Sequence, residues 1–198
     1  MSTNIVLDGY ELVGEAYLAE REKQRSDKYV RKLLKRLKPN TKILDLGCGA
    51  GVPVDDLLLA EGHEVVGIDI SPRMIARARR NCPAGQYMVK DILRLNPGDF
   101  KVEAIVSFYT WFHLPRSRQG ELLKTINSYV GKGGYLLITM GDREFEGEHQ
   151  FFGMKMWSSQ WGIDKNSALV ERAGWKILEA GIDTSGGERH QIILAQKK

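Results

Sequence analysis

The chain alternates between short apolar runs and segments whose apolar residues recur at helical spacing. The apolar runs fall near 42–46, 64–68, 86–89, 102–107, 134–140, 175–182 and 190–196, and the helical patterns near 8–19, 25–37, 53–61, 72–81, 117–130 and 165–173. This alternation predicts seven strands joined by right-handed helical crossovers, that is, a three-layer α/β sandwich. Gly186 and Gly187 predict a hairpin between the last two strands.

One predicted helix is strongly basic. Residues 21–38 hold nine basic and two acidic residues, although the net charge of the whole chain is only +4. A basic run of this kind can contact nucleic acid. Apolar residues at i, i+3, i+4 and i+7 instead favour an amphipathic helix that packs on the sheet and leaves its basic side in solvent. These apolar residues are Val30, Leu33, Leu34 and Leu37.

Three glycines at alternate positions follow the first apolar run and carry the clearest functional signal. Gly47, Gly49 and Gly51 come directly after Asp45 and Leu46. Glycine lets the backbone approach a nucleotide-like ligand because it has no Cβ. A dinucleotide-binding turn reads G-x-G-x-x-G, but Val52 stands where its third glycine belongs. A carboxylate would repel a diphosphate and attract a sulfonium and an ammonium group, so the loop favours S-adenosylmethionine over NAD.

The run Asp45–Gly51 resembles the first motif of class I S-adenosylmethionine-dependent methyltransferases. Three later segments, Glu64–Ser71, Gln86–Ile92 and Ala104–Pro115, match that family in order and spacing, and the resemblance covers roughly residues 30–140. Each segment contains the carboxyl end of a predicted strand, where open α/β sheets bind ligands. The resemblance implies a Rossmann-like α/β/α fold with strand order 3-2-1-4-5-7-6, strand 7 antiparallel, and S-adenosyl-L-methionine as the cofactor.

The same resemblance implies which residues contact the cofactor. The residue matching Asp69 binds the ribose hydroxyls, that matching Ile70 packs on the adenine, and that matching Asp91 contacts the adenine amino group. Ser71 is predicted to cap the helix that begins at Pro72. The full expected set of cofactor-binding residues is Asp45, Gly47, Cys48, Gly49, Gly51, Asp69, Ile70, Met74, Asp91, Ile92 and Phe108.

Methyl transfer needs an aligned acceptor and, where the acceptor loses a proton, a base. His113 is the candidate base because it follows the fourth strand and imidazole titrates near neutral pH, although a structural role is an equal alternative. Tyr109 and Trp111, in the same turn, are candidate substrate contacts. His63 and His190 are interpreted as surface residues. The four histidines and two cysteines do not form a metal-binding pattern, so we expect no metal.

Two segments lie outside the core that the family shares. The N-terminal region 1–38 resembles a helical lid, in which Tyr17 contacts substrate or, with equal weight, packs on the core. The second segment, 142–163, is expected to be a long loop that acts as a substrate lid. Its aromatic residues and methionine form a mainly apolar substrate cavity in this hypothesis, and core residues under a loop in the alternative. The residues are Phe151, Phe152, Met154, Trp157 and Trp161.

The length and composition of the chain indicate how many domains it forms and where in the cell we expect it. A length of 198 residues fits a single domain, 1–198. No apolar stretch is long enough to span a bilayer, and the N-terminus does not resemble a signal peptide, so we expect a cytoplasmic protein that does not enter membranes. Two cysteines are too few for a disulfide framework.

The acceptor is the least defined part of the prediction. The chain lacks the N/D-P-P-Y/F and P-C signatures of nucleobase methylation at the end of the fourth strand, where Phe108–Trp111 stands. These absences disfavour nucleobase chemistry. The small size of the chain, Phe112–Pro115 and the aromatic segment after the fifth strand resemble the branch of the family that methylates small molecules. A protein or RNA methyltransferase and a non-catalytic S-adenosylmethionine-binding protein are the alternatives. The sequence carries no signal for an oligomeric state.

Overall fold

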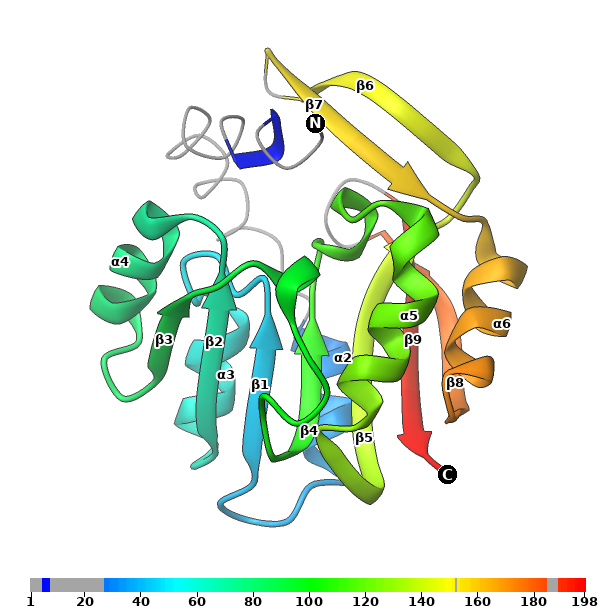
Figure 1. The fold of residues 1–198 in the computed structure, drawn as a ribbon. Helices are drawn as coiled ribbons and strands as arrows, with labels where there is room; N and C mark the ends of the chain where they lie inside the picture. Colours follow the sequence, from blue (N-terminus) through cyan, green and yellow to red (C-terminus); the bar gives the residue numbers. More distant parts are fainter. Residues whose placement is uncertain (1–4, 8–26, 152, 185–188) are drawn as a thin grey trace.

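The computed structural model describes residues 5–7, 27–151, 153–184 and 189–198. Its centre is a seven-stranded sheet of order β3-β2-β1-β4-β5-β9-β8 (Figure 1). The strands are β1 Lys42–Leu46, β2 Glu64–Asp69, β3 Gln86–Val89, β4 Val102–Ser107, β5 Val130–Gly141, β8 Trp175–Asp183 and β9 His190–Lys197. Strands β1 to β5 pair in parallel, and β9 is antiparallel to β5 and β8. The predicted order is confirmed, since β8 and β9 are the sixth and seventh strands of this sheet.

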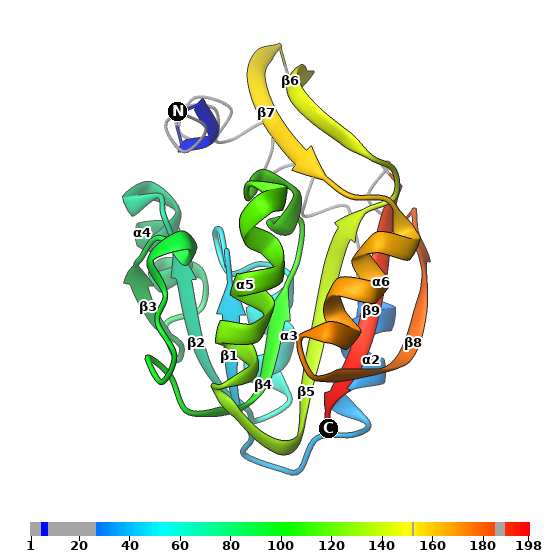
Figure 2. The same ribbon diagram turned by 45° about the vertical axis from the view of Figure 1, so that its right-hand side comes forward.

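Helices cover both faces of the sheet (Figure 2). Helices α2 and α3 lie on one face, and α5 and α6 lie on the other. Ile43 and Leu44 show why β1 is central: they are neighbours in sequence, yet each is fully buried in a different core cluster. A strand buried on both faces reads as a continuous apolar run, which is the pattern that the sequence showed. The helices are α2 Asp27–Leu34, α3 Val54–Ala60, α4 Pro72–Asn81, α5 Arg116–Asn127 and α6 Ile163–Arg172, with 3₁₀ turns η1 Ile92–Arg94 and η2 Trp111–His113.

Segment 142–163 is not the irregular loop that we expected. It forms an antiparallel hairpin of β6 Phe145–Phe151 and β7 Met154–Gln160, above the carboxyl ends of the parallel strands (Figure 1). Gly153 adopts a positive φ of 78° in the connection, which allows the tight reversal. The hairpin places side chains alternately on two faces, so its aromatic residues are divided between them.

Helix α2 packs as its apolar spacing predicts. Val30 and Leu33 are buried against the sheet, while the basic side forms ion pairs with other parts of the domain. Lys28 lies 3.7 Å from Asp183, and Lys32 pairs with Glu179. In the expected N-terminal lid region, 1–38, residues 1–4 and 8–26, which include Tyr17, lie outside the described residues.

Among the described residues, no helix is both long enough and apolar enough to cross a membrane.

Candidate functional site

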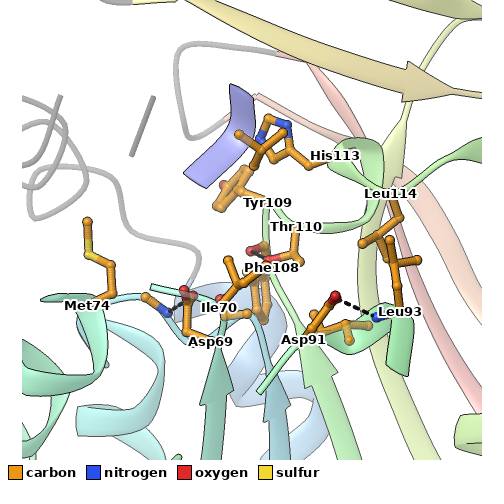
Figure 3. A pocket seen from close by; sticks show the side chains of 14 residues that line it. Asp69, Ile70, Met74, Asp91, Leu93, Phe108, Tyr109, Thr110, His113 and Leu114 are labelled. Carbon is orange, nitrogen blue, oxygen red and sulfur yellow. Dashed lines mark hydrogen bonds between the residues drawn. The ribbon is translucent and has the colours of Figure 1, made fainter. Parts of the chain in front are cut away.

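A cavity opens at the carboxyl ends of β1, β2 and β4 (Figure 3). Asp69 and Asp91 lie on opposite sides of its lower part, with Tyr109 and His113 above them. Its described lining residues are Val6, Gly47, Gly49, Asp69, Ile70, Met74, Asp91, Ile92, Leu93, Phe108, Tyr109, Thr110, His113 and Leu114. Most of the residues expected to contact the cofactor are therefore brought together. Sequence reasoning did not single out Val6, Leu93, Thr110 or Leu114.

The three loop positions require glycine for different physical reasons. A Cβ on Gly47 would stand 2.1 Å from Oγ1 of Thr110, and one on Gly51 would stand 3.1 Å from Sγ of Cys82. A Cβ on Gly49 would meet no atom of the described residues within 4 Å. Gly47 and Gly51 thus permit close packing within the protein, whereas Gly49 faces the open cavity. All three have positive φ, between 53° and 80°.

Asp69 is oriented by the backbone on both of its oxygens. Oδ2 accepts a hydrogen bond from the N–H of Gly49 at 3.0 Å, and Oδ1 accepts one from Ser71 at 2.9 Å. Ser71 in turn caps α4 by accepting from the N–H of Met74, with Pro72 as the first helical residue, as predicted. These contacts fix a carboxylate at the cavity wall beside the glycine loop.

Asp91 holds the opposite side of the cavity. Its Oδ1 accepts a hydrogen bond from the N–H of Leu93 at 2.9 Å and so caps η1. The cap directs Ile92 and Leu93 to the cavity lining. The carboxylate and the two apolar side chains together form a wall that suits a planar ring with a polar edge.

Asp45 does not reach the cavity lining, contrary to the expectation that it faces the cofactor. Its side chain is buried beneath the glycine loop with that of Asp55, and the two are 3% and 0% exposed. Burial raises the pKa of Asp55 to about 7. Burial and the charge of Asp55 raise the pKa of Asp45 well above its ordinary range. Burial and the repulsion between two neighbouring carboxylates thus both favour the protonated forms.

Cys48 and Gly51 also lie outside the lining, because the loop turns them toward the protein. Sγ of Cys48 packs so close to β2 that a Cβ on Gly67 would approach it to 2.8 Å. Burial raises the pKa of the Cys48 thiol well above its ordinary range. Cys48 therefore acts here as a small apolar side chain.

The turn after β4 divides its aromatic residues between cavity and core. Tyr109 lines the cavity with a positive φ of 56°, which is uncommon for a bulky residue, and its hydroxyl donates to Oδ2 of Asp183 at 3.2 Å. Trp111 is fully buried in the cluster beneath α5. The expectation that Trp111 contacts substrate is therefore corrected: the 3₁₀ turn directs its ring inward.

His113 is held in one orientation by the hairpin. Its Nδ1 lies 3.0 Å from the carbonyl oxygen of Trp157. A carbonyl can only accept, so Nδ1 carries the proton and the neutral ring has its basic lone pair on Nε2. Trp157 thus contributes through its backbone, and its side chain lines neither cavity.

Two histidines that we interpreted as surface residues are buried. His190, 7% exposed, stacks on Phe112 with ring centroids 4.8 Å apart and planes 8° from parallel. His63, 9% exposed, accepts the backbone N–H of Thr41 at Nδ1, and burial lowers its pKa. The residues next to each histidine in the sequence are polar or glycine, so the local sequence pattern did not indicate that these side chains are buried.

A second cavity lies between the hairpin and the sheet. It shares His113 with the first, and its volume is about 360 Å³ against about 110 Å³. Its described lining residues are Phe112, His113, Asp142, Arg143, Phe145, His149, Phe151, Ser158, Gln160, Arg189 and His190. Of the expected apolar substrate contacts, Phe151 lines it, whereas Met154, Trp157 and Trp161 do not; Phe152 lies outside the described residues. The cavity is more polar than we expected.

Comparison with known proteins agrees with this arrangement. A family model described as a methyltransferase domain matches residues 17–180. The chain belongs to this family. The resemblance of its motifs to class I S-adenosylmethionine-dependent methyltransferases is confirmed.

Individual relatives of this methyltransferase-family chain are distant. Carboxy-S-adenosyl-L-methionine synthase of Yersinia pestis is 26% identical over 172 residues, 78% of this chain and 62% of that protein, so the chain spans less than two thirds of this relative's length. Magnesium protoporphyrin IX methyltransferase from Synechocystis PCC 6803, solved with bound S-adenosylmethionine, superposes with a TM-score of 0.70 and 18% identity over 87% of this chain and 77% of that one.

A further solved structure contains a small-molecule ligand. The 1,6-didemethyltoxoflavin-N1-methyltransferase of Burkholderia thailandensis, bound to 1,6-didemethyltoxoflavin and S-adenosylhomocysteine, has a TM-score of 0.73 and 16% identity over 96% of this chain and 84% of that one. At such identities, these structures establish the shared fold.

Proposed function

We propose that this protein is an S-adenosylmethionine-dependent methyltransferase that methylates a small molecule. The observation that carries the proposal is the Asp69 carboxylate, fixed by two backbone N–H groups beside the open side of Gly49. A second cavity, which shares the lining residue His113 with the first, offers room for an acceptor. The basic side of α2 forms ion pairs within the domain, which gives less support to an RNA acceptor.

The lining residues fit S-adenosylmethionine chemically. Asp69 would hold the ribose hydroxyls, Asp91 the adenine amino group, and the apolar side chains of Ile70 and Ile92 the faces of the ring. Met74 and Phe108 would complete the apolar lining, and Gly49 leaves the space that a Cβ would take. When bound, this cofactor supplies an electrophilic methyl group on a sulfonium sulfur.

The protein contributes alignment and a proton acceptor. Tyr109 and His113 line the cavity wall nearest the second cavity, where they would orient an acceptor O–H or N–H toward the methyl group. We assign the base to Nε2 of His113, because the hydrogen bond from Nδ1 to Trp157 sets that tautomer. An acceptor held there would pass its proton to Nε2 of His113 as it takes the methyl group that the bound cofactor would supply.

Titration calorimetry with S-adenosylmethionine and S-adenosylhomocysteine tests cofactor binding. Asp69→Ala should weaken binding about 10- to 100-fold, because hydrogen bonds to a charged group are lost. Asp164→Ala, an exposed acid at the start of α6, is the matched control and should bind as the wild type does. If neither ligand binds to folded wild-type protein, the proposed function fails.

The base assignment is tested with an acceptor found by transfer of a labelled methyl group. His113→Gln should lower kcat about 10²- to 10⁴-fold near neutral pH. The loss should shrink at a pH that ionises the acceptor without a base. A loss that is equal at every pH would instead show a positioning role.

A further inference from the structure

The described lining of the second cavity has an excess of positive charge. Among these residues, Arg143 and Arg189 stand against one acid, Asp142, whose carboxylate lies 3.2 Å from Arg189. The other acids of the hairpin are neutralised elsewhere: Glu144 and Glu146 pair with Arg116, and Glu148 pairs with Lys155. Within the described part of the chain, no carboxylate lies at ion-pair distance from Arg143. An anion entering this cavity would therefore meet a net attractive field.

The inner face of β6 adds a row of rings. Phe145 and Phe151 flank His149 edge-on, with centroids 6.1 Å and 6.4 Å from that of His149. Gly147 lies on the same face between Phe145 and His149, where the absence of a side chain leaves space beside the rings. Aromatic edges and faces of this kind favour a planar unsaturated ligand over a flexible aliphatic one.

The position of His113 connects these features to the reaction. It lines both cavities, so a molecule in the second cavity borders the residue that we assign as the base. His149 is itself oriented, since its Nε2 lies 2.8 Å from Oγ of Ser158. The hairpin thus lines the cavity with rings and a hydroxyl, and Arg143 before β6 and Arg189 before β9 line the same cavity.

We propose that the second cavity binds the methyl acceptor and that the acceptor is a planar aromatic molecule with an oxyanion, either a carboxylate or a phosphate. Arg143 and Arg189 hold the oxyanion, because the guanidinium fork matches the geometry of both groups. The rings of β6 hold the planar part and direct its nucleophile toward His113. This inference rests on the proposed function and names the substrate class of that site.

Three small probes test the inference on the complex with S-adenosylhomocysteine. Benzoate carries a carboxylate, phenylphosphonate a phosphate-like group, and benzamide is the neutral analogue of benzoate. Binding is measured by titration calorimetry, or by ligand-observed NMR for millimolar affinities. At least one anionic probe should bind about tenfold more tightly than benzamide, because a charge-assisted pair is made with the arginines. The difference between benzoate and phenylphosphonate distinguishes the two oxyanions.

Substitutions test whether the preference for anionic probes arises in the second cavity. Arg143→Ala combined with Arg189→Ala should remove the preference for the anion, and Asp142→Asn should strengthen it by removing the competing acid. Arg118→Ala, an arginine of α5 that pairs with Glu121 outside this cavity, is the matched control and should keep the preference. Equal binding of all three probes, or binding of none while S-adenosylhomocysteine binds, would overturn the inference and leave the proposed function standing. Failure of S-adenosylhomocysteine itself to bind would contradict the proposed function instead.

Discussion

Gly47 and Gly49 occupy similar places in the sequence motif and different places in the structure. Both have positive φ, a conformation that costs a residue with a Cβ roughly 1–2 kcal/mol. Only Gly47 also faces a close protein neighbour, Thr110, which hydrogen-bonds back to the Gly47 carbonyl at 3.3 Å. The motif therefore combines a packing requirement and a ligand requirement in glycines two residues apart.

Alanine at each position should separate these two requirements. Gly47→Ala should lower the free energy of unfolding by about 2–5 kcal/mol, from backbone strain and overpacking against Thr110. Gly49→Ala should lower it by only about 1–2 kcal/mol and should weaken S-adenosylhomocysteine binding. Urea unfolding and titration calorimetry measure the two effects. The assignment is wrong if Gly49→Ala binds as tightly as the wild type, or if the two variants are equally destabilised.

Buried hydrogen bonds from Gln119 help to attach the β6–β7 hairpin to the domain. The amide nitrogen of Gln119, on α5, lies within 3.1 Å of the carbonyl oxygens of Trp111, Leu114 and Ser159. Gln119 is 1% exposed, so these carbonyls have little access to water. One side chain thus joins α5, the turn that carries His113, and strand β7.

Replacement of this amide should loosen the hairpin. Gln119→Leu should cost about 2–3 kcal/mol of unfolding free energy, because buried carbonyls lose their donor. Amide hydrogen exchange should accelerate across 145–160 more than in the central strands. The same substitution at Gln150, which is exposed on β6, is the control and should change neither quantity much. Uniform acceleration over the whole domain would contradict a local attachment role.

For the whole molecule, the buried carboxyls under the glycine loop link stability to pH. The pKa of Asp55 is raised to about 7 by burial, and that of Asp45 is raised in the same direction. The folded state therefore keeps protons that the unfolded chain releases above its ordinary pKa of about 4. The resulting stability is complete below about pH 4 and is lost as pH rises through about 7.

Asp55→Asn should make stability less dependent on pH. Between pH 4 and 7, the wild type should lose up to about 4 kcal/mol that the variant retains, because the amide has no proton to release. Urea unfolding at several pH values measures the difference. Asp56→Asn, at the exposed neighbouring position, should follow the wild-type curve. Identical slopes for wild type and Asp55→Asn would show that the carboxyl ionises normally in the fold.

Local pattern was sufficient for the strands of the main sheet and for the start of α4. The apolar runs predicted the bounds of β1 and β4, because most positions of these two central strands are buried. The Ser71–Pro72 pair defined the start of α4, because capping depends on adjacent residues. Asp69 and Asp91 could be placed because the ends of parallel strands meet at one edge.

Tertiary packing decided which of these residues face a ligand. The sequence by itself determined the loop of three glycines and, through the resemblance of its motifs, the family and with it the order of the strands. Only the folded structure turned Trp111 into the core, buried Asp45 with Asp55, and brought Arg143, His149 and Arg189 together beside His113. These outcomes depend on contacts between elements far apart in sequence, which no local periodicity encodes.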